Sequence, residues 1–500
     1  MSRIAAAVVA VVGLLVAVMS GLAQSAPSPS APSPSAPSPS AKPSPPGALK
    51  NGEAWAWTQL VNGKSHTTEV RFATTEKPAG HCPTLKYTVG GKMQTAVLRK
   101  ASDPFVTGGG LQQFPTTFCV APVPDGARDA LIEPTTTVAA TVYPGNLQPP
   151  LPEWPVNGRP RSIAVIGDAG CEVPSSTVGS TQNQDCQNDW PLEPLSAHAA
   201  AMSHPDLVVH VGDYVYREAP EGANDATPGC DSQGQAADWA CLIKDFLRPA
   251  QAFLAEAPIV FARGNHEDCT PSKVGRGAEW FRYFATVPRK NNECYSLPQV
   301  QTEPVQINAG TLHFVLFDSS SASESNQPNQ AQAARFAKWF NEVNDLAANH
   351  PKHDYFLITH KPLWMVKQAS SAGVTWINPT LASAVRRTAK GALADNIDLV
   401  LSGHLHMYQM LDFLKSTRPP QLTVGSSGTT LDTPPDDTKV EGKTVDGEIV
   451  QHSISRGVHG YALLSDTGGQ WHLTFHGVAG QAWPQDCALS TGPTKEFDCK

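Results

Sequence analysis

The chain has 500 residues, of which 16% are charged, and its formal net charge at pH 7 is −8. Five hundred residues are too many for one small hydrophobic core, so we expect two domains with additional segments. The negative net charge, without any basic cluster in the sequence, argues against a nucleic-acid backbone as the partner.

The first 25 residues have the pattern of a secretory signal peptide. Arg3 precedes an apolar stretch at 4–19, and small residues follow, so cleavage is expected after Ala23 or Ser25. The apolar stretch is short for a helix that spans a bilayer, and no second segment resembles one. We expect a secreted or cell-envelope, extracytoplasmic protein that keeps no stable membrane span after cleavage. An uncleaved anchor is the alternative.

Residues 26–47 form a linker rich in proline, serine and alanine, which begins with three copies of APSPS. Alternating prolines keep such a segment extended and semi-rigid. The linker either associates the protein with a cell wall, as a stalk, or acts as a plain spacer.

Residues 48–148 alternate apolar and polar side chains between turn signals such as Asn62-Gly63. This texture predicts an N-terminal β-sandwich domain. Because none of the candidate ligands described below lies in it, we assign it no chemistry.

Residues 158–485 alternate strand-like runs with helical patterns, which predicts a layered α/β domain. The clearest helix spans 330–349, where apolar residues fall on one face. Residues 237–254 and 380–393 are further helix candidates. Past residue 420 the pattern returns to strands, which predicts a second sheet that closes a sandwich.

Ten cysteines in an exported chain predict disulfides, and none of them forms a CxxC pair typical of zinc or redox sites. Two of the ten lie in a C-terminal tail at 486–500. The sequence does not fix the connectivity. Pairing of sequence neighbours is a hypothesis, and it would join Cys82 with Cys119, Cys171 with Cys186, Cys230 with Cys241, Cys269 with Cys294, and Cys487 with Cys499.

Five short apolar runs of the second domain each lead into a turn that carries Asp, Asn or His. The turns are Gly167-Asp168-Ala169-Gly170, Gly212-Asp213-Tyr214-Val215-Tyr216, Gly264-Asn265-His266-Glu267, Thr359-His360-Lys361-Pro362 and Gly403-His404-Leu405-His406. In α/β proteins, ligands gather where strands end. Oxygen and imidazole donors without a thiolate suit hard or borderline metal ions. The five turns therefore predict a metal site.

In this order, GDAG, GDYVY, GNHE, ITHKP and GHLH resemble the calcineurin-like metallophosphoesterase superfamily, and within it the purple acid phosphatases. The resemblance covers roughly residues 161–410. Most superfamily members place a histidine where this chain has Gly170, whereas purple acid phosphatases use the tyrosine of GDxxY, here Tyr216. The resemblance implies a four-layer α/β/β/α metallophosphoesterase sandwich after a small all-β, fibronectin III-like domain.

The resemblance also implies a binuclear metal centre. Fe(III) would be held by Asp168, Tyr216 and His406. A divalent Fe, Zn or Mn would be held by Asn265, His360 and His404, and Asp213 would bridge the two ions. This division is chemically reasonable, because anionic oxygens suit the trivalent ion and neutral donors suit the divalent one.

Two residues are the expected catalytic groups, His266 and the bridging Asp213. His266 would contact the phosphate and protonate the leaving group, since histidine titrates near working pH. A structural histidine beside the metal ligands is the alternative. Some family members carry further substrate-facing histidines after the one that matches His360, but here Ala369 and Ser370 occupy that region.

The expected function is that of a secreted, purple acid phosphatase-like hydrolase. It would cleave small-molecule phosphomonoesters by a metal-bound hydroxide. One alternative is a phosphodiesterase or nucleotidase of the same fold. A second is a wall-anchored binding module with an inactive phosphatase fold, although the complete set of seven ligands argues against it.

Overall fold

The computed structural model describes residues 54–62, 67–75, 82–101, 114, 116–133, 151–154, 158–173, 184–217, 238–270, 274–286, 294, 301–369, 373–377, 379–478, 486–491 and 494–499. The predicted signal peptide and proline-rich linker lie outside these residues. Residues 46–500 form one compact unit. Within the described part of the chain, no helix is both long and apolar enough to cross a membrane.

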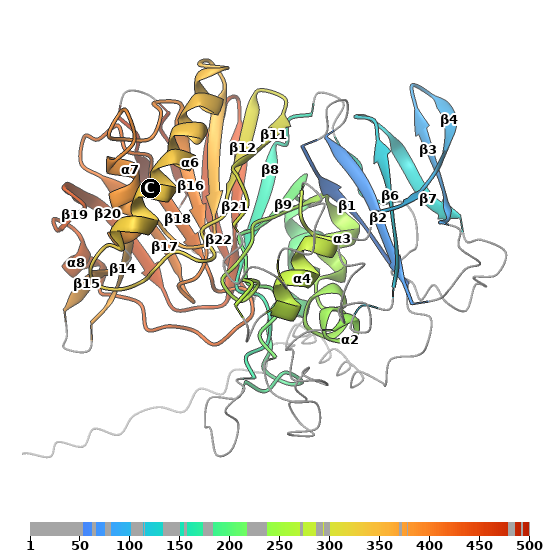
Figure 1. Ribbon diagram of the computed structural model, residues 1–500, viewed down its shortest axis with the longest axis horizontal. Helices are drawn as coiled ribbons and strands as arrows, with labels where there is room; N and C mark the ends of the chain where they lie inside the picture. Colours follow the sequence, from blue (N-terminus) through green and yellow to red (C-terminus); the bar gives the residue numbers. More distant parts are fainter. Residues whose placement is uncertain are drawn as a thin grey trace, which may run out of the picture. The chain divides into compact units, whose positions relative to one another are not determined.

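Two large sheets dominate this unit (Figure 1). In spatial order, the first contains β24 (Phe497–Cys499), β23 (Cys487–Leu489), β22 (Gln470–Gly477), β21 (Gly460–Thr467), β8 (Ser162–Ile166), β9 (Leu207–His210), β10 (Ile259–Phe261), β1 (Ala54–Leu60), β2 (Thr68–Thr74), β6 (Thr117–Val123) and β5 (Arg99–Lys100). The second contains β11 (Val305–Ala309), β12 (Leu312–Phe317), β13 (Asp354–Thr359), β16 (Ile397–Ser402), β18 (Gln421–Val424), β17 (Tyr408–Phe413), β20 (Glu448–Arg456) and β19 (Thr444–Val445).

Two smaller sheets complete the described strands. One pairs β14 (Met365–Gln368) with β15 (Val374–Ile377). The other has the order β4 (Lys92–Val97), β3 (Thr84–Val89) and β7 (Arg128–Glu133). The strands after residue 420 divide between the two large sheets: β18 and β20 join the second, whereas β21 and β22 extend the first.

The described helices are α1 (Leu192–His198), α2 (Trp239–Leu242), α3 (Gln251–Glu256), α4 (Val274–Tyr283), α6 (Gln330–Ala348), α7 (Pro379–Arg386) and α8 (Asp437–Val440), with π-helical turns η3 (Ala199–Ser203) and η4 (Ile243–Leu247). The predicted helix at 330–349 is confirmed as α6, which Asn329 caps by accepting a hydrogen bond from the Gln332 N–H. The helix predicted at 237–254 is interrupted before α3, where Pro249 has no N–H to donate.

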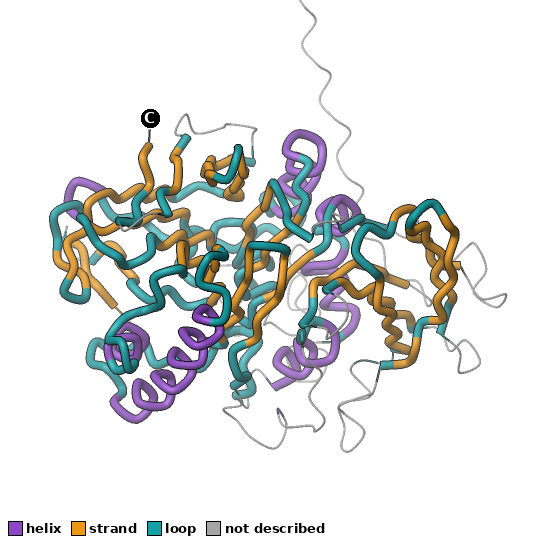
Figure 2. Tube along the Cα trace, turned by 90° about the horizontal axis from the view of Figure 1, so that it is seen from above, coloured by secondary structure: helices purple, strands orange, loops and turns teal. Residues whose placement is uncertain are grey.

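The two large sheets and the helices that cover them form four layers, with an apolar core between each pair of neighbouring layers. The middle core lies between the sheets and includes Val165 and Val209 of the first sheet and Ile358 and Leu401 of the second. The opposite face of the first sheet packs on α1, α3 and α4. The outer face of the second sheet packs on α6 and α7, which lie side by side against it (Figures 1 and 2). The α/β/β/α order expected from the sequence is therefore present.

The N-terminal strands continue the first large sheet. Strand β1 pairs in parallel with β10 through Gln59 and Ile259. The buried Arg71 of β2 donates hydrogen bonds to the carbonyl oxygens of Tyr283 (2.6 Å) and Ala285 (3.0 Å), at the end of α4. The first strands are thus joined to the α/β layers by backbone and side-chain contacts. The fibronectin III-like character predicted for this region is not confirmed, and the domain boundaries stay a prediction.

Four of the five predicted disulfides are confirmed: Cys82–Cys119, Cys171–Cys186, Cys269–Cys294 and Cys487–Cys499. The fifth, Cys230–Cys241, cannot be assessed because Cys230 lies outside the described residues.

The five turns with candidate ligands follow parallel strands. Strands β8, β9 and β10 are parallel neighbours in the first sheet, and β13 and β16 are parallel neighbours in the second. The turns of each sheet therefore emerge at the same edge. The backbone N–H of His404, after β16, donates a 2.8 Å hydrogen bond to Asp168 Oδ2, after β8, which joins the two edges.

Candidate metal centre

One half of the candidate site is built around the Tyr216 hydroxyl. This oxygen lies 2.8 Å from Asp168 Oδ1, 2.9 Å from Asp213 Oδ2 and 3.2 Å from His406 Nε2. Asp168, Asp213 and Tyr216 are each at most 2% exposed. A phenol and two carboxylates from two separate turns therefore meet at one buried point.

The other half is built around His360. Its Nε2 lies 2.9 Å from Asn265 Oδ1 and 3.1 Å from Asp213 Oδ2. Ligand atoms of Asp213, His360 and His404 all lie within 4.8 Å of one another. The structure thus brings together all seven predicted ligands, with Asp213 shared by the two halves. That they bind metal remains a proposal.

The second ring nitrogen of His360 is also engaged. Its Nδ1–H donates to the Val211 carbonyl oxygen at 2.9 Å. Metal-binding histidines usually donate their other N–H in this way, which fixes the tautomer and leaves one lone pair for the cation. In His360, Nε2 is thus the ring nitrogen directed at Asn265 and Asp213.

Three of the seven candidate ligands have strained backbones. The φ angles of Asp168, Asp213 and His404 are 52°, 56° and 71°, in the left-handed region that residues other than glycine rarely adopt. Each such residue costs about 1–3 kcal/mol and persists only where the surroundings impose it. All three lie in the turns where the candidate ligands meet.

The structure leaves no room for a side chain at Gly170. A β-carbon there would lie 2.6 Å from the Tyr216 nitrogen, 2.8 Å from Asp245 Oδ2 and 3.0 Å from the Tyr214 carbonyl oxygen. The backbone that presents Tyr216 thus fills the space of any side chain at position 170. Tyr216 and Gly170 are two parts of one local structure.

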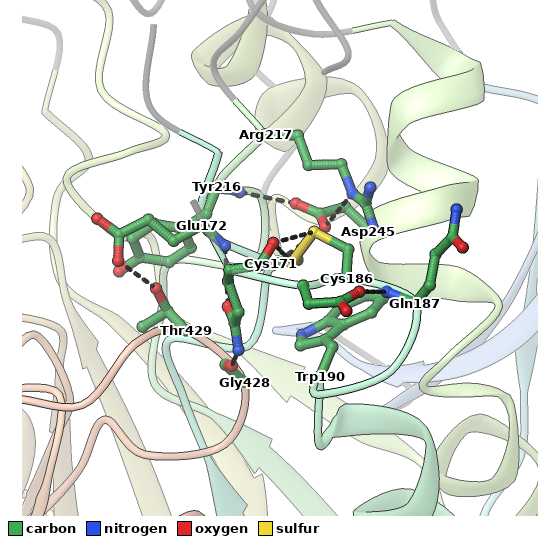
Figure 3. The surroundings of a disulfide bond; sticks show 12 residues. Cys171, Glu172, Cys186, Gln187, Trp190, Tyr216, Arg217, Asp245, Gly428 and Thr429 are labelled. Carbon is green, nitrogen blue, oxygen red and sulfur yellow. Dashed lines mark hydrogen bonds and ion pairs between the residues drawn. A yellow bond between two sulfur atoms is a disulfide. The ribbon is translucent and has the colours of Figure 1, made fainter. Parts of the chain in front are cut away.

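Two buried carboxylates that sequence reasoning missed hold the turns in place. Glu267 Oε2 accepts hydrogen bonds from the N–H groups of Asp213 and Gly264, each at 3.0 Å. Asp245, on η4, accepts from the N–H groups of Cys171 (2.9 Å) and Tyr216 (2.7 Å), as Figure 3 shows. Glu267 lies inside the GNHE motif and could have been suspected. No sequence signal marked Asp245.

The loop after Asp168 has further restraints (Figure 3). The Cys171–Cys186 disulfide closes it. The Trp190 indole N–H donates to the Ala169 carbonyl oxygen at 3.0 Å, and the Gln184 amide donates to the Gly428 carbonyl oxygen at 2.7 Å. These contacts fix the loop to the segment before α1 and to the loop after β18.

Burial and the charges of neighbouring groups together set the pKa values of the site. It raises the pKa of Asp168 to about 6, and it raises that of Tyr216 well above its usual value, with the charges of Asp168 and Asp213 acting in the same direction. Burial acts to lower the pKa of His360, but the charge and hydrogen bond of Asp213 outweigh it and raise the pKa to about 9. Cations would reverse these effects on the carboxyl and phenol groups. The donor set consists of oxygens and imidazoles, with Tyr216 at 2.8 and 2.9 Å from two carboxylates and His360 at 2.9 Å from Asn265, and it suits hard or borderline cations.

His266 lies beside the seven candidate ligands. Its ring centroid is 4.2 Å from that of Tyr216, and its backbone N–H donates to Asp213 Oδ1 at 2.8 Å. Its Nδ1 lies 3.0 Å from Nη1 of the buried Arg276, which sequence reasoning did not single out. Because arginine can only donate, His266 Nδ1 is the acceptor.

Glu324 is another residue that the sequence did not reveal. Its Oε2 lies 3.1 Å from His404 Nε2, and Oε1 forms an ion pair with Lys361. Burial raises the pKa of Glu324, but the hydrogen bond and charge of His404 together with Lys361 lower it more, so that the carboxylate stays ionised.

Comparisons with known proteins identify the same region. A family model described as calcineurin-like phosphoesterase matches residues 161–408. No curated protein matches the chain.

Among solved structures, the chain resembles that entitled "Structure of PhoD", with a TM-score of 0.51 and 11% sequence identity over 91% of this chain and 93% of that one. At such identity, the likeness concerns the fold alone. A conserved uncharacterized protein of Streptococcus pneumoniae TIGR4, a predicted phosphoesterase, matches with a TM-score of only 0.24 and 10% identity over 68% of this chain and 98% of that one. That value is too low to support an argument.

Proposed function

We propose, from the premise that residues 161–408 belong to the calcineurin-like metallophosphoesterase superfamily, that this protein is an exported, purple acid phosphatase-like phosphomonoesterase with a binuclear metal centre. The superfamily implies a hydrolase that acts on phosphoester bonds with the help of metal ions. The observation that carries the finer proposal is the Tyr216 hydroxyl, which lies within 2.9 Å of both Asp168 and Asp213.

The proposed ligands divide between two cations. Asp168, Tyr216 and His406 would hold Fe(III), whereas Asn265, His360 and His404 would hold a divalent Fe, Zn or Mn, with Asp213 shared. When bound, such a pair neutralises phosphate oxygens and activates water at the working pH. A phenolate and two carboxylates favour a trivalent ion in the first position, because they are hard anionic donors.

His266 is the proposed general acid. As an acid it must start as the imidazolium, in which both ring nitrogens carry a proton, so the Nδ1 contact with Arg276 has to open before Nε2 can deliver its proton to the leaving oxygen. Its backbone N–H, bound to Asp213, holds the imidazole next to the centre. The proton would thus come from a group that its backbone holds beside the centre.

Export is proposed from the signal-like N-terminus and is supported by the four disulfides, which form and persist in oxidising compartments. The substrate would be a small phosphate ester.

The decisive experiment is metal analysis of the purified protein together with its absorption spectrum. We expect two metals per chain and a visible band from iron bound to the Tyr216 phenolate. If oxidised iron is bound but this band is missing, Tyr216 is not an iron ligand and its role is in packing. A protein that purifies without two metals would instead be an inactive binding module.

Turnover separates the remaining alternatives. Faster hydrolysis of p-nitrophenyl phosphate than of its bis ester supports the monoesterase, and the reverse order supports a phosphodiesterase. Asp213→Asn should abolish turnover, whereas His266→Ala should slow it by about 10²–10⁴-fold and leave metal binding largely intact. Full activity in either variant would refute the assigned roles.

A further inference from the structure

Glu324 is the residue whose role the proposed function leaves unexplained. It lies in the loop after β12, on an element that carries none of the seven candidate ligands, yet its Oε2 is 3.1 Å from His404 Nε2. The Glu324 side chain is 39% exposed and that of His404 is 15% exposed. The contact therefore lies at the solvent side of the site.

The loop that carries Glu324 is bound to the turn that carries His360. Ser319 Oγ accepts hydrogen bonds from Thr359 Oγ1 and from the Lys361 N–H, each at 2.8 Å. Lys361 Nζ donates to the Ala322 carbonyl oxygen at 2.9 Å and pairs with Glu324 Oε1. The Glu324 carboxylate is consequently fixed at one oxygen by Lys361, with the other directed at His404.

The three candidate histidines do not use the same ring nitrogen. Nε2 of His360 and Nε2 of His406 face the oxygen donors of the site. In His404, Nε2 faces Glu324 instead. A carboxylate can only accept, so Nε2 carries the proton, and the lone pair of a neutral His404 ring is on Nδ1.

We propose that Glu324 is a positioning residue for the divalent cation: it accepts a hydrogen bond from His404 Nε2–H and thereby holds the Nδ1 lone pair of His404 toward the site. The inference rests on the proposed function. A carboxylate behind a ligating imidazole also makes that imidazole a better donor. Lys361 contributes by keeping the carboxylate in place.

The test measures cation affinity, not only activity. The full-length protein and its variants are stripped of the divalent ion and titrated with Zn²⁺ or Mn²⁺ by calorimetry. Glu324→Ala should weaken binding by about 10–100-fold, the usual effect of losing such a partner. Glu324→Gln should weaken it less, because the amide oxygen still accepts from Nε2–H. Glu342→Ala, an exposed glutamate of α6, is the matched control and should leave the affinity unchanged.

A second readout follows the imidazole itself. The ¹⁵N spectrum of histidine-labelled, metal-free protein should show His404 protonated at Nε2, and Glu324→Ala should lose this preference. Wild-type affinity in Glu324→Ala, or a His404 protonated at Nδ1, would overturn the inference.

Asp213→Asn separates this failure from failure of the proposed function. If Asp213→Asn loses the cation and Glu324→Ala does not, only the role proposed for Glu324 is refuted. If neither variant changes the affinity for the cation, the proposed metal centre is refuted.

Discussion

The backbone N–H of Tyr216 donates a 2.7 Å hydrogen bond to the buried carboxylate of Asp245, although 29 residues separate the two. The other oxygen of Asp245 accepts from the Cys171 N–H, directly after the GDAG turn, and from Arg217 Nε at 2.8 Å. One side chain thus fixes the two turns that supply Asp168 and Tyr216. Its position governs the geometry of the candidate Fe(III) site.

Asp245→Ala should therefore destabilise the fold and loosen the site. The substitution leaves the guanidinium of Arg217, 6% exposed, without its carboxylate. Removing one partner of a buried ion pair costs about 3–5 kcal/mol. Urea unfolding measures this loss, and metal analysis should show lower iron content. Asp436→Ala, which removes an exposed helix cap, should cost much less. Equal losses in the two variants would contradict the role of Asp245.

Tyr216→Phe removes the hydroxyl between Asp168 and Asp213 while keeping the ring. We expect the fold to persist but the iron content and the visible band to be lost, because the phenolate is the proposed ligand and chromophore. Iron analysis and absorption spectroscopy check this. Tyr461→Phe is the control, since its buried hydroxyl bonds to Ser203, outside the centre. A Tyr216→Phe protein with unchanged iron and colour would show that another residue is the ligand.

Gly170→Ala tests the close approach between the first two ligand turns. The new methyl group would lie 2.6 Å from the Tyr216 nitrogen and 2.8 Å from Asp245 Oδ2, neither of which can move without breaking their hydrogen bond. We expect a loss of about 3 kcal/mol in stability, at the upper end for overpacking, and reduced metal content. Thermal and urea unfolding measure it. Gly442→Ala, where the methyl group meets nothing within 4 Å, should show only the backbone strain of its φ of +76°.

The lowered pKa of His313 predicts how the stability of the folded protein depends on pH. The ring is buried, and Nε2 lies 2.8 Å from Nδ1 of His353. Burial, followed by the charges of His353 and His350, lowers the pKa of His313 from 6.5 to about 4. The unfolded chain therefore takes up this proton at higher pH than the folded protein. The contribution to stability is complete above pH 6.5 and is lost as the pH falls toward 4.

The measurement is urea unfolding at several pH values between about 4 and 7.5. His313→Gln should flatten the decline below pH 6.5. His472→Gln, a partly exposed histidine paired with Asp486, should leave the decline unchanged. An equally steep decline in His313→Gln would assign the acid sensitivity to other groups.

Much of the fold could be predicted because its signals are local. Helix α6 was recognisable from its apolar face and the capping Asn329, and the β8, β9, β10, β13 and β16 strands from apolar runs that end in turns. The joining of β1 to β10 was not predictable, because pairing between strands about 200 residues apart leaves no periodic signal. For the same reason, the sequence did not predict that the strands after residue 420 divide between the two large sheets.

The sequence by itself determined the chemistry of the site: the carboxylates, phenol, amide and imidazoles, their spacing within each turn, and Gly170 as the partner of Tyr216. These properties depend on residue type and short-range geometry. Only the tertiary structure decided which groups hold those donors in place. Asp245, Glu267, Arg276 and Glu324 act through hydrogen bonds and ion pairs across turns from different strands. Such contacts join segments that only the folded chain brings together, so, apart from Glu267 inside the GNHE motif, no local sequence pattern could predict them.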